Sequence, residues 1–498
     1  MRAGVSPSAA STQADASVPS SGGATAVALV TGAALLGVAA SVATYVRGRR
    51  LTFDGYHYVE MAKQFAQEWP DRFGNHWTFG YPFAGGLLTR LGLPAYGSLV
   101  LLSTAALCGL LWAFRGILAE RGVPRRGQAA ALAALAVCPV VAIELFGVLT
   151  ELPFAAAVLA LALVLARAST APRLLWLAAT AALAAFSIRY AGVLALATLG
   201  LWSLLMLRNA GRSGRIHVIA ATACAAVISL LLLGLNLWRS GHLSGADRSG
   251  AEGLSSFPQQ LADFGWAPVS ALIGNGLRER LVVASPLATH ALGSLVTAAL
   301  LLLAWSAWRR SSARYSQTLA LTVVVYTLGM AALRCVGTFD GLSNGRMFLP
   351  ILAPALLLVF EHWRRPAAVF GVCAALGLLG GLGALRGISA QIGANVQPGV
   401  DRLRQELRAD DRIGINDHAF ALTAHFDQRT VRTWPIENFS VPMCRLYVIA
   451  ARPLDRAGTP GELASDWRDA IARAVEGGRC RILEQQPGLV VLERRGAP

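Results

Sequence analysis

An acidic residue and two polar aromatic residues stand at helical spacing shortly after the first long apolar run of the chain. Asp54, His57, Tyr58 and Met61 have i, i+3, i+4 spacing, so a helix places them on one face. A carboxylate just beyond a membrane helix suits a general base for an acceptor hydroxyl. It also suits a metal ligand or an ordinary N-cap, because Asp is common before a helical run. The spacing alone leaves these alternatives open.

Further ionisable residues stand at the ends of apolar runs. Glu151 and Arg189 are at such edges, where charged groups are costly and tend to be functional. Arg334 and Arg346 flank a short polar segment, and a guanidinium offers a fork that matches phosphate oxygens. The structural alternatives are an interfacial carboxylate in water for Glu151 and a snorkelling helix-end cation for Arg189.

The composition places these residues in a membrane protein. The chain has 498 residues, mean hydropathy +0.51 and 14% charged residues, whereas a soluble protein carries about a quarter. Its apolar runs are near the ~20 residues that cross a bilayer, and such spans must be helical. The net charge of +16 fits basic loops and anionic lipid better than nucleic acid. No P-loop or dinucleotide fingerprint is present, so no nucleotide is expected.

About eleven runs are predicted to span the membrane. They lie at 24–46, 96–114, 128–147, 153–167, 174–188, 191–207, 217–237, 286–306, 317–333, 347–362 and 366–386. The first run is long for a signal-peptide core and is interpreted as a retained helix. The runs at 174–188 and 191–207 are short. A single helix bent near Arg189 is the alternative, and it would reverse the orientation of every later span.

The charges of the loops decide between eleven spans and the ten that a single bent helix would give. With eleven spans, alternate short loops collect the arginines and face the cytoplasm. These are Arg115, Arg121, Arg125, Arg126, Arg167, Arg173, Arg208, Arg212, Arg215, Arg309, Arg310, Arg314, Arg364 and Arg365. One cluster conflicts with this orientation: Arg47, Arg49 and Arg50 follow the first span and would face the outside. The balance predicts a cytoplasmic N-terminus and an extracytoplasmic C-terminal domain.

The chain therefore divides into a disordered cytoplasmic tail at 1–22, a transmembrane domain at 23–386 and an extracytoplasmic α/β domain at 387–498. In the last part, RIGIN and RLYVIAA are predicted strands, 463–478 is a helix, and 481–495 is a hairpin around Pro487 and Gly488. Cys444 and Cys480 adjoin predicted strands in an oxidising compartment, so a disulfide between them is a further prediction.

An ordered series of motifs resembles the GT-C membrane glycosyltransferases, which include the protein O-mannosyltransferases and the bacterial lipid A aminoarabinose transferases. FDGYHYVEMA and GYPFAGGLL resemble their first outer loop, GVLTELPF the second, and SIRYAGVLAL an Arg-Tyr-Ala-Gly element. NLWRSGHLSGADRS, FDGLSNGRMFLPILAPALLL and GINDHAFALTAHFDQRTVRTWP resemble a later loop, a helix entry with arginine, and the start of the outer domain.

The resemblance implies a GT-C-like, all-α polytopic fold and a polyprenyl-phosphate-linked sugar donor. It implies Asp54 and Glu151 as catalytic residues, with Arg346 favoured over Arg334 at the lipid phosphate. The residues that it implies for substrate binding are His57, Tyr58, Tyr81, Arg189, Tyr190, Arg248 and Arg346. Many members have two adjacent acids where this chain has Asp54-Gly55, which weakens the case for a metal-binding pair. Glu60, Asp71, His57 and His76 are the candidates that could compensate, and a divalent metal stays open.

The function predicted from the sequence is inverting transfer of a sugar from a polyprenyl-phosphate carrier to an acceptor hydroxyl. The site is expected at the outer face of a bacterial plasma membrane, with a lipid, glycan or protein acceptor, membrane lipid as a partner and no nucleic acid. The alternatives are a polymerase or ligase of lipid-linked glycans, a membrane transporter and a lipid-binding scaffold. A polymerase or ligase would not need a base at Asp54, and a transporter predicts charges deep in the spans.

Overall fold

A computed structural model describes most of the chain. The described residues are 53–67, 78–136, 138–208, 211–243, 253–273, 276–311, 313–337, 341–362, 397–408, 411–416, 430–432, 439, 444–451, 463–486 and 488–495. The predicted tail at 1–22, the predicted spans 24–46 and 366–386, Arg47, Arg49, Arg50, Asp71, His76 and Arg248 lie outside these ranges.

Six of the described helices are long and apolar enough to cross a membrane, so the chain is a multi-pass membrane protein. They correspond to predicted spans and comprise α4 (Ala95–Glu120), α7 (Glu151–Ala168), α9 (Val193–Leu207) with its preceding turn, α10 (Arg212–Ser240), α14 (Pro286–Arg310) and α15 (Arg314–Val336). Three shorter apolar helices lie among the described residues: α5 (Arg125–Ala136), α8 (Leu175–Ile188) and α16 (Leu349–His362). The total number of spans stays a prediction.

Helix α7 occupies the middle of the bundle. It packs against α8, α4, α16 and α15, and two thirds of its spanning window is buried. Its sequence alternates alanine with leucine and valine, and small side chains let neighbouring helix backbones approach closely in a membrane. The residue at its N-terminus, Glu151, is therefore buried inside the bundle.

Two breaks between helices matter for the site, one inside a predicted span and one between two predicted spans. The run 128–147 was predicted as one helix but forms α5 (Arg125–Ala136) and α6 (Pro139–Phe146). Pro139 explains this correction, because proline lacks an N–H donor and disfavours helix in the residue before it. The break predicted at Arg189 is confirmed. Arg189 is extended (φ −155°, ψ 138°), and the short turn η2 (Tyr190–Gly192) leads into α9.

The two long loops that the topology placed outside form helices of their own. The first loop contains α2 (Phe53–Gln67) and α3 (Gly80–Arg90), which pack against each other. The second contains η3 (Leu254–Ser256), α11 (Phe257–Phe264), α12 (Trp266–Ile273) and α13 (Gly276–Ala284). A short turn, η1 (Pro172–Leu174), links α7 to α8, and η4 (Gly345–Met347) precedes α16. The polar loops thus supply ordered elements around the helix ends.

Three of the arginine-rich loops meet at one end of the bundle. Arg167 at the end of α7 donates to Glu120 of α4 over 2.6 Å and to the hydroxyl of Tyr315 of α15 over 2.9 Å. Arg121 donates to Ser316 over 2.7 Å. Glu151 is the first residue of α7, and Arg167 is next to its last residue. Because an 18-residue helix is about 27 Å long, the two residues lie at opposite ends of α7. The arginine loops and Glu151 therefore lie at opposite ends of the bundle.

The C-terminal part is a small α/β unit, as predicted. Its five-stranded sheet has the order β2-β1-β3-β5-β4, with β1 parallel to β2 and β3 and the remaining pairs antiparallel. The strands are β1 (Arg412–Ile415), β2 (Thr430–Arg432), β3 (Cys444–Ala450), β4 (Cys480–Gln486) and β5 (Leu489–Arg494). Helices α18 (Gln397–Glu406) and α20 (Ser465–Glu476) accompany it. The predicted helix and hairpin are confirmed; β2 and α18 were not predicted.

The predicted disulfide is wrong for this structure, because both Cys444 and Cys480 are thiols. Strand β5 lies between the strands that carry them, with Cys480 opposite Arg494 and Leu446 opposite Glu493. Two strand spacings make about 9–10 Å, whereas a disulfide needs Cα atoms within about 7 Å. Sequence spacing gave the strands but not their order in the sheet.

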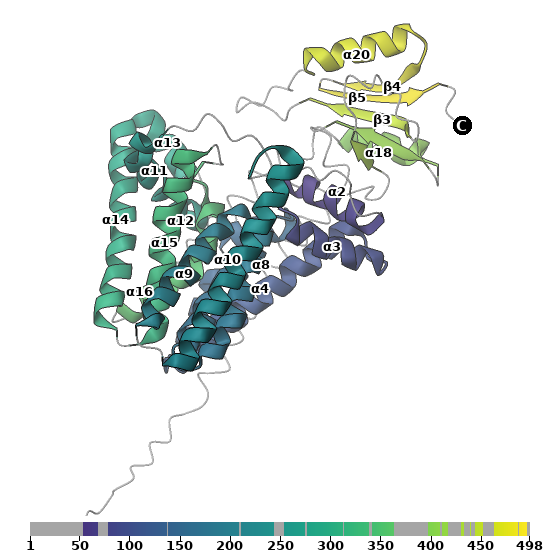
Figure 1. Cartoon of the computed structure of the whole chain (residues 1–498). Helices are drawn as coiled ribbons and strands as arrows, with labels where there is room; N and C mark the ends of the chain where they lie inside the picture. The colour runs from purple at the N-terminus through teal and green to yellow at the C-terminus, as the bar shows by residue number, and fades with distance from the viewer. Residues whose placement is uncertain are drawn as a thin grey trace, which may run out of the picture.

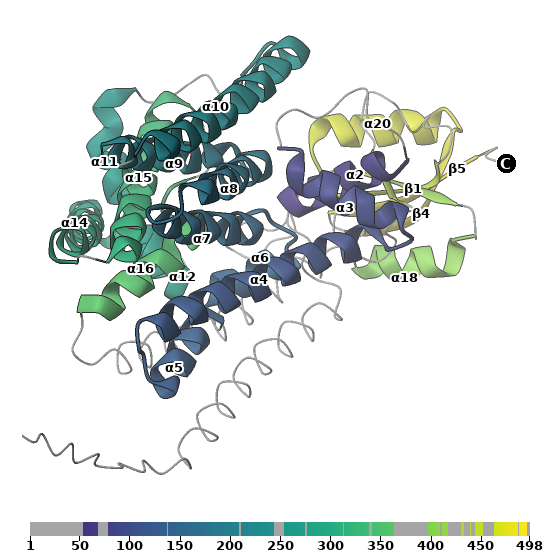
Figure 2. The same ribbon diagram turned by 60° about the horizontal axis from the view of Figure 1, so that its bottom comes forward.

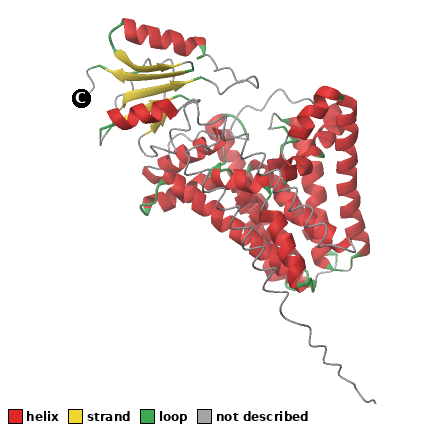
Figure 3. Cartoon of the chain, turned by 180° about the vertical axis from the view of Figure 1, so that it is seen from behind, coloured by secondary structure: helices red, strands yellow, loops and turns green. Residues whose placement is uncertain are grey.

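The sheet unit lies beside α2 and α3 at one end of the molecule (Figures 1 and 2). One cluster of buried apolar side chains includes Tyr58 and Val59 of α2, Tyr81 of α3, and Ile413 and Leu446 of the sheet. Within the described ranges, all strands gather at this end, and the elements of the bundle are helices (Figure 3). The first loop is thus packed between the sheet unit and the helical bundle.

Candidate active site

An ion pair joins residues from the two ends of the helical part of the sequence. Nη1 of Arg346 donates to Oδ2 of Asp54 over 2.8 Å, although 292 positions separate them in the chain. Asp54 stands in the first turn of α2 and Arg346 in η4. Their side chains are 21% and 15% exposed, so the pair is accessible to a ligand without being open to bulk water.

Glu151 lies at the centre of the same cluster. Its Oε1 accepts a hydrogen bond from Nη1 of Arg189 and lies 3.6 Å from Nε of Arg346. Arg189 also donates to the hydroxyl of Thr150 over 3.3 Å. The carboxylate starts helix α7, where the aligned peptide dipoles favour negative charge. Two guanidinium groups therefore converge on one buried carboxylate, which is 1% exposed.

Two short turns fix the backbone positions of Arg189 and Arg346. Gly192 closes the turn after Arg189, and a Cβ there would stand 2.3 Å from the backbone nitrogen of Phe186. Gly345 lets η4 lie on α12, because a Cβ there would stand 2.5 Å from the backbone nitrogen of Ala271. The Asn344 side chain caps η4 by accepting from the Arg346 N–H over 3.2 Å. Larger residues at either glycine would displace an arginine.

Tyrosines support the cluster from the first loop. The Tyr58 hydroxyl lies 3.5 Å from that of Thr150, and its ring meets the Tyr81 ring edge-on at 5.7 Å. The Tyr81 hydroxyl turns away to α4, where it donates to the carbonyl of Leu99 and contacts Ser103. Burial raises the pKa of both phenols above the ordinary value, so neither is available as a base.

The structure does not bring every predicted residue to this cluster. His57 is half-buried on α2, one turn after Asp54. The Tyr190 hydroxyl accepts from Asn236 of α10 over 3.0 Å and its ring packs on Phe186. Glu60 pairs with Lys63 along α2 at 2.8 Å, so it does not replace a second acid beside Asp54. Arg248 lies outside the described residues, and Arg334 stands at the end of α15 rather than in η4.

Glu144 is a member of the cluster that sequence reasoning missed. It lies on α6 and is fully buried. Its carboxyl group is within hydrogen-bonding reach of that of Glu151 and feels the charges of Arg346 and Arg189. The sequence carried a signal for it, because Glu144 is the one acid in the predicted span 128–147. An ionisable residue inside an apolar run is a functional candidate by default.

The described residues do not fit a divalent metal. They contain no group of three or more His, Cys, Asp and Glu side chains suited to one. Asp54 and Glu151 each face a guanidinium, and a cation between them would meet the positive charges of Arg189 and Arg346. The arrangement suits an anion that exchanges with the carboxylates on the arginines.

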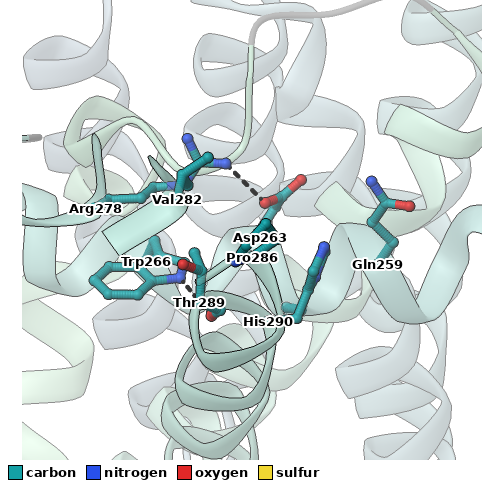
Figure 4. Close-up of a pocket in the computed structure, with 9 residues that line it drawn as sticks. Gln259, Asp263, Trp266, Arg278, Val282, Pro286, Thr289 and His290 are labelled. Carbon is teal, nitrogen blue, oxygen red and sulfur yellow. Dashed lines mark hydrogen bonds and ion pairs between the residues drawn. The ribbon is translucent and has the colours of Figure 1, made fainter. Parts of the chain in front are cut away.

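A separate pocket of about 130 Å³ opens between α11, α13 and α14 (Figure 4). Arg278 donates to Asp263 over 3.0 Å across it, with Gln259 and His290 on the other wall. The two charges in this pocket neutralise each other. The cluster around Glu151, with converging charges and a buried acid, is therefore the stronger candidate site.

No family model and no curated protein matches the sequence. Among solved structures, ArnT from Cupriavidus metallidurans bound to undecaprenyl phosphate is 14% identical, with TM-score 0.44 over 93% of this chain and 98% of that chain. An Archaeoglobus fulgidus oligosaccharyltransferase in complex with Zn and sulfate is 12% identical, with TM-score 0.45 over 84% and 68%. These are GT-C enzymes, the class that the sequence motifs resemble.

Proposed function

We propose that this chain is an inverting glycosyltransferase that moves a sugar from a polyprenyl-phosphate carrier to an acceptor hydroxyl. The observation that carries the proposal is the convergence of Asp54, Glu151, Arg189 and Arg346 at one end of the bundle. A general base and two phosphate-binding groups are what such a transfer requires. They stand where helix ends meet polar loops, so a lipid-borne donor and a water-borne acceptor can meet there.

Asp54 is the proposed base. The acceptor oxygen attacks the anomeric carbon as the bond from that carbon to the phosphate oxygen breaks, which inverts the configuration. The hydroxyl proton passes to the Asp54 carboxylate. The buried Tyr58 and Tyr81 stay protonated, and Glu151 is held by guanidinium groups, so Asp54 is the most accessible carboxylate of the cluster.

Arg346 and Arg189 are the proposed ligands of the donor phosphate. Charge grows on the phosphate as it leaves, and fixed guanidinium groups stabilise that charge without reorganisation. Glu151 holds both side chains toward one point and thus serves as an orienting residue at the catalytic site. His57, on the Asp54 face of α2, is placed to contact the acceptor or the sugar.

The Asp54–Arg346 contact implies that the donor binds before Asp54 acts as the base. While the pair is closed, Arg346 neutralises the base. A donor phosphate that takes over Arg346 leaves the Asp54 carboxylate facing the acceptor. Binding of the donor would therefore activate the base, and the base would stay paired when no donor is present.

We place this end of the bundle at the extracytoplasmic face of a bacterial plasma membrane. The support is the positive-inside rule, because several arginine loops meet at the opposite end. In this arrangement the tail at 1–22 is cytoplasmic, 23–386 is the membrane domain and 387–498 lies outside. The acceptor is then a lipid, glycan or protein in the cell envelope.

The test uses the full-length protein in lipid nanodiscs with a polyprenyl-phosphate-linked sugar and a panel of envelope acceptors. Release of free polyprenyl phosphate and a product of inverted anomeric configuration are expected, with no use of a nucleotide sugar. The matched control is Glu60→Gln, which removes an acid from α2 without touching the cluster. Failure to consume any lipid-linked donor, with folded protein, would refute the proposal.

A further inference from the structure

Glu144 is a buried acid for which the proposed reaction has no task. Its side chain is fully enclosed, and no hydrogen-bond donor from the described residues reaches either carboxyl oxygen. No ion pair to Glu144 is formed by the part of the chain that the structure describes. An ionised carboxylate in such a place would carry a large desolvation cost without compensation.

The chain brings this acid to Glu151 by a strained turn. Val148, between α6 and α7, has φ 56°, which is unfavourable for a β-branched residue, and it is fully buried. The Leu149 N–H donates to the carbonyl of Glu144 over 3.2 Å and closes the turn. Strain of this kind persists where the surrounding structure enforces it, commonly at functional sites. Here it brings Glu144 of α6 against Glu151 of α7.

A single shared proton would satisfy the carboxyl groups of both Glu144 and Glu151. Oε2 of Glu151 and both carboxyl oxygens of Glu144 are buried, and no donor from the described residues reaches them. The two carboxyl groups are within hydrogen-bonding reach of each other. Two ionised carboxylates in contact repel and cannot donate. A single proton between them removes one charge and supplies the missing donor.

The charge of the cluster indicates which acid holds the proton. Glu151 faces Arg189 and Arg346, so it is the anion, whereas Glu144 accepts from neither. With Glu144 neutral, Asp54 and Glu151 balance the two arginines. With Glu144 ionised, the cluster would have one excess negative charge and would repel the donor phosphate.

We propose that Glu144 is protonated and donates to Oε2 of Glu151, so that Oε1 of Glu151 stays on the arginines that hold the donor phosphate. Glu144 is thus a positioning residue that acts through Glu151. Groups facing it are Glu151 from α7, Arg346 from η4, Arg189 from the end of α8, and Tyr81 from α3. The catalytic part of this inference rests on the proposed glycosyltransferase function; the shared proton does not.

The proton is tested by infrared difference spectroscopy of wild type against Glu144→Gln, in nanodiscs near neutral pH. The wild type should show the carbonyl stretch of a protonated carboxyl group, and the variant should lack it. Glu60→Gln serves as the control and should leave the band unchanged. If replacing Glu144 removes no such band, the shared proton is refuted, whether or not the protein transfers sugar.

The positioning role is tested by activity. Glu144→Gln keeps a donor of the same shape and should transfer within about threefold of wild type. It should also retain its rate at high pH, where the wild type loses the shared proton. Glu144→Leu leaves Glu151 without a donor and should lose about 10- to 100-fold, mostly as weaker donor binding. An equal loss of transfer rate in both variants would overturn the positioning role. So would a Glu144→Gln variant whose rate falls at high pH just as the wild-type rate does.

Discussion

The substitution Asp54→Asn separates the two roles that the structure gives to this carboxylate. Asparagine has nearly the same shape and can still accept a hydrogen bond from Arg346 through Oδ1. It cannot take a proton from an acceptor hydroxyl. Loss of a general base typically lowers the rate about 10²- to 10⁴-fold, so transfer should fall by at least about a hundredfold.

Donor binding should change in the opposite direction. In the wild type the phosphate must displace Asp54 from Arg346, a contact of 2.8 Å between side chains that are 21% and 15% exposed. A charge-assisted hydrogen bond of this kind is worth roughly 1.5–3 kcal/mol when enclosed, and partial exposure reduces it to about 1 kcal/mol. Neutral asparagine is displaced more easily, so donor affinity should rise about fivefold.

The assay combines single-turnover transfer with equilibrium binding of a polyprenyl-phosphate-linked sugar, both in nanodiscs. Glu60→Gln on the same helix should leave transfer and binding unchanged, because Glu60 pairs with Lys63. Wild-type transfer by Asp54→Asn would refute the assignment of the base. Weaker donor binding in that variant would refute the competition between Asp54 and the phosphate. If Asp71→Asn abolishes transfer instead, the base lies elsewhere in the first loop.

Three further outcomes follow from the same contacts. Arg346→Lys keeps a charge but loses the fork that reaches Asp54 and Glu151, so turnover should drop about tenfold or more while the purified protein stays monodisperse; full turnover would remove Arg346 from the site. A reporter that is active only outside the cytoplasm, fused after Pro498, should be active, and activity of a cytoplasm-only reporter there would reverse the proposed sidedness. Hydrogen bonds from Arg445 lower the pKa of Asp411 below its ordinary value of 3.8, so the unfolded chain binds that proton more readily and the sheet loses stability as pH falls below about 4. The hydrogen-exchange protection factors of β3 in the full-length protein, which correct for the slower chemical exchange at low pH, should fall over this range, and much less in Asp411→Asn. Identical pH dependence of the protection factors in both proteins would contradict this expectation.

Much of the fold was predictable because it depends on local pattern. Apolar length and lipid's lack of hydrogen-bond partners fix the spanning helices, and period-two runs gave β1, β3 and the final hairpin. Arg189 as the break between α8 and α9 was also predictable, since loop charge required two helices there. The break at Pro139 was missed although proline signals it, because hydropathy alone continues across it.

The candidate residues Asp54, Glu151, Arg189 and Arg346 could be chosen from the sequence, because charged groups at the ends of apolar runs are costly and conspicuous. Their partners could not, since hydrogen bonds between positions 292 residues apart depend on how the helices pack. Tertiary structure alone decided that Tyr81 turns to α4 and that β5 separates Cys444 from Cys480. It also decided that Glu144 meets Glu151. Sequence determines which groups are expensive to bury, whereas packing determines which of them share a charge, because electrostatic and hydrogen-bond contacts act only over a few ångströms.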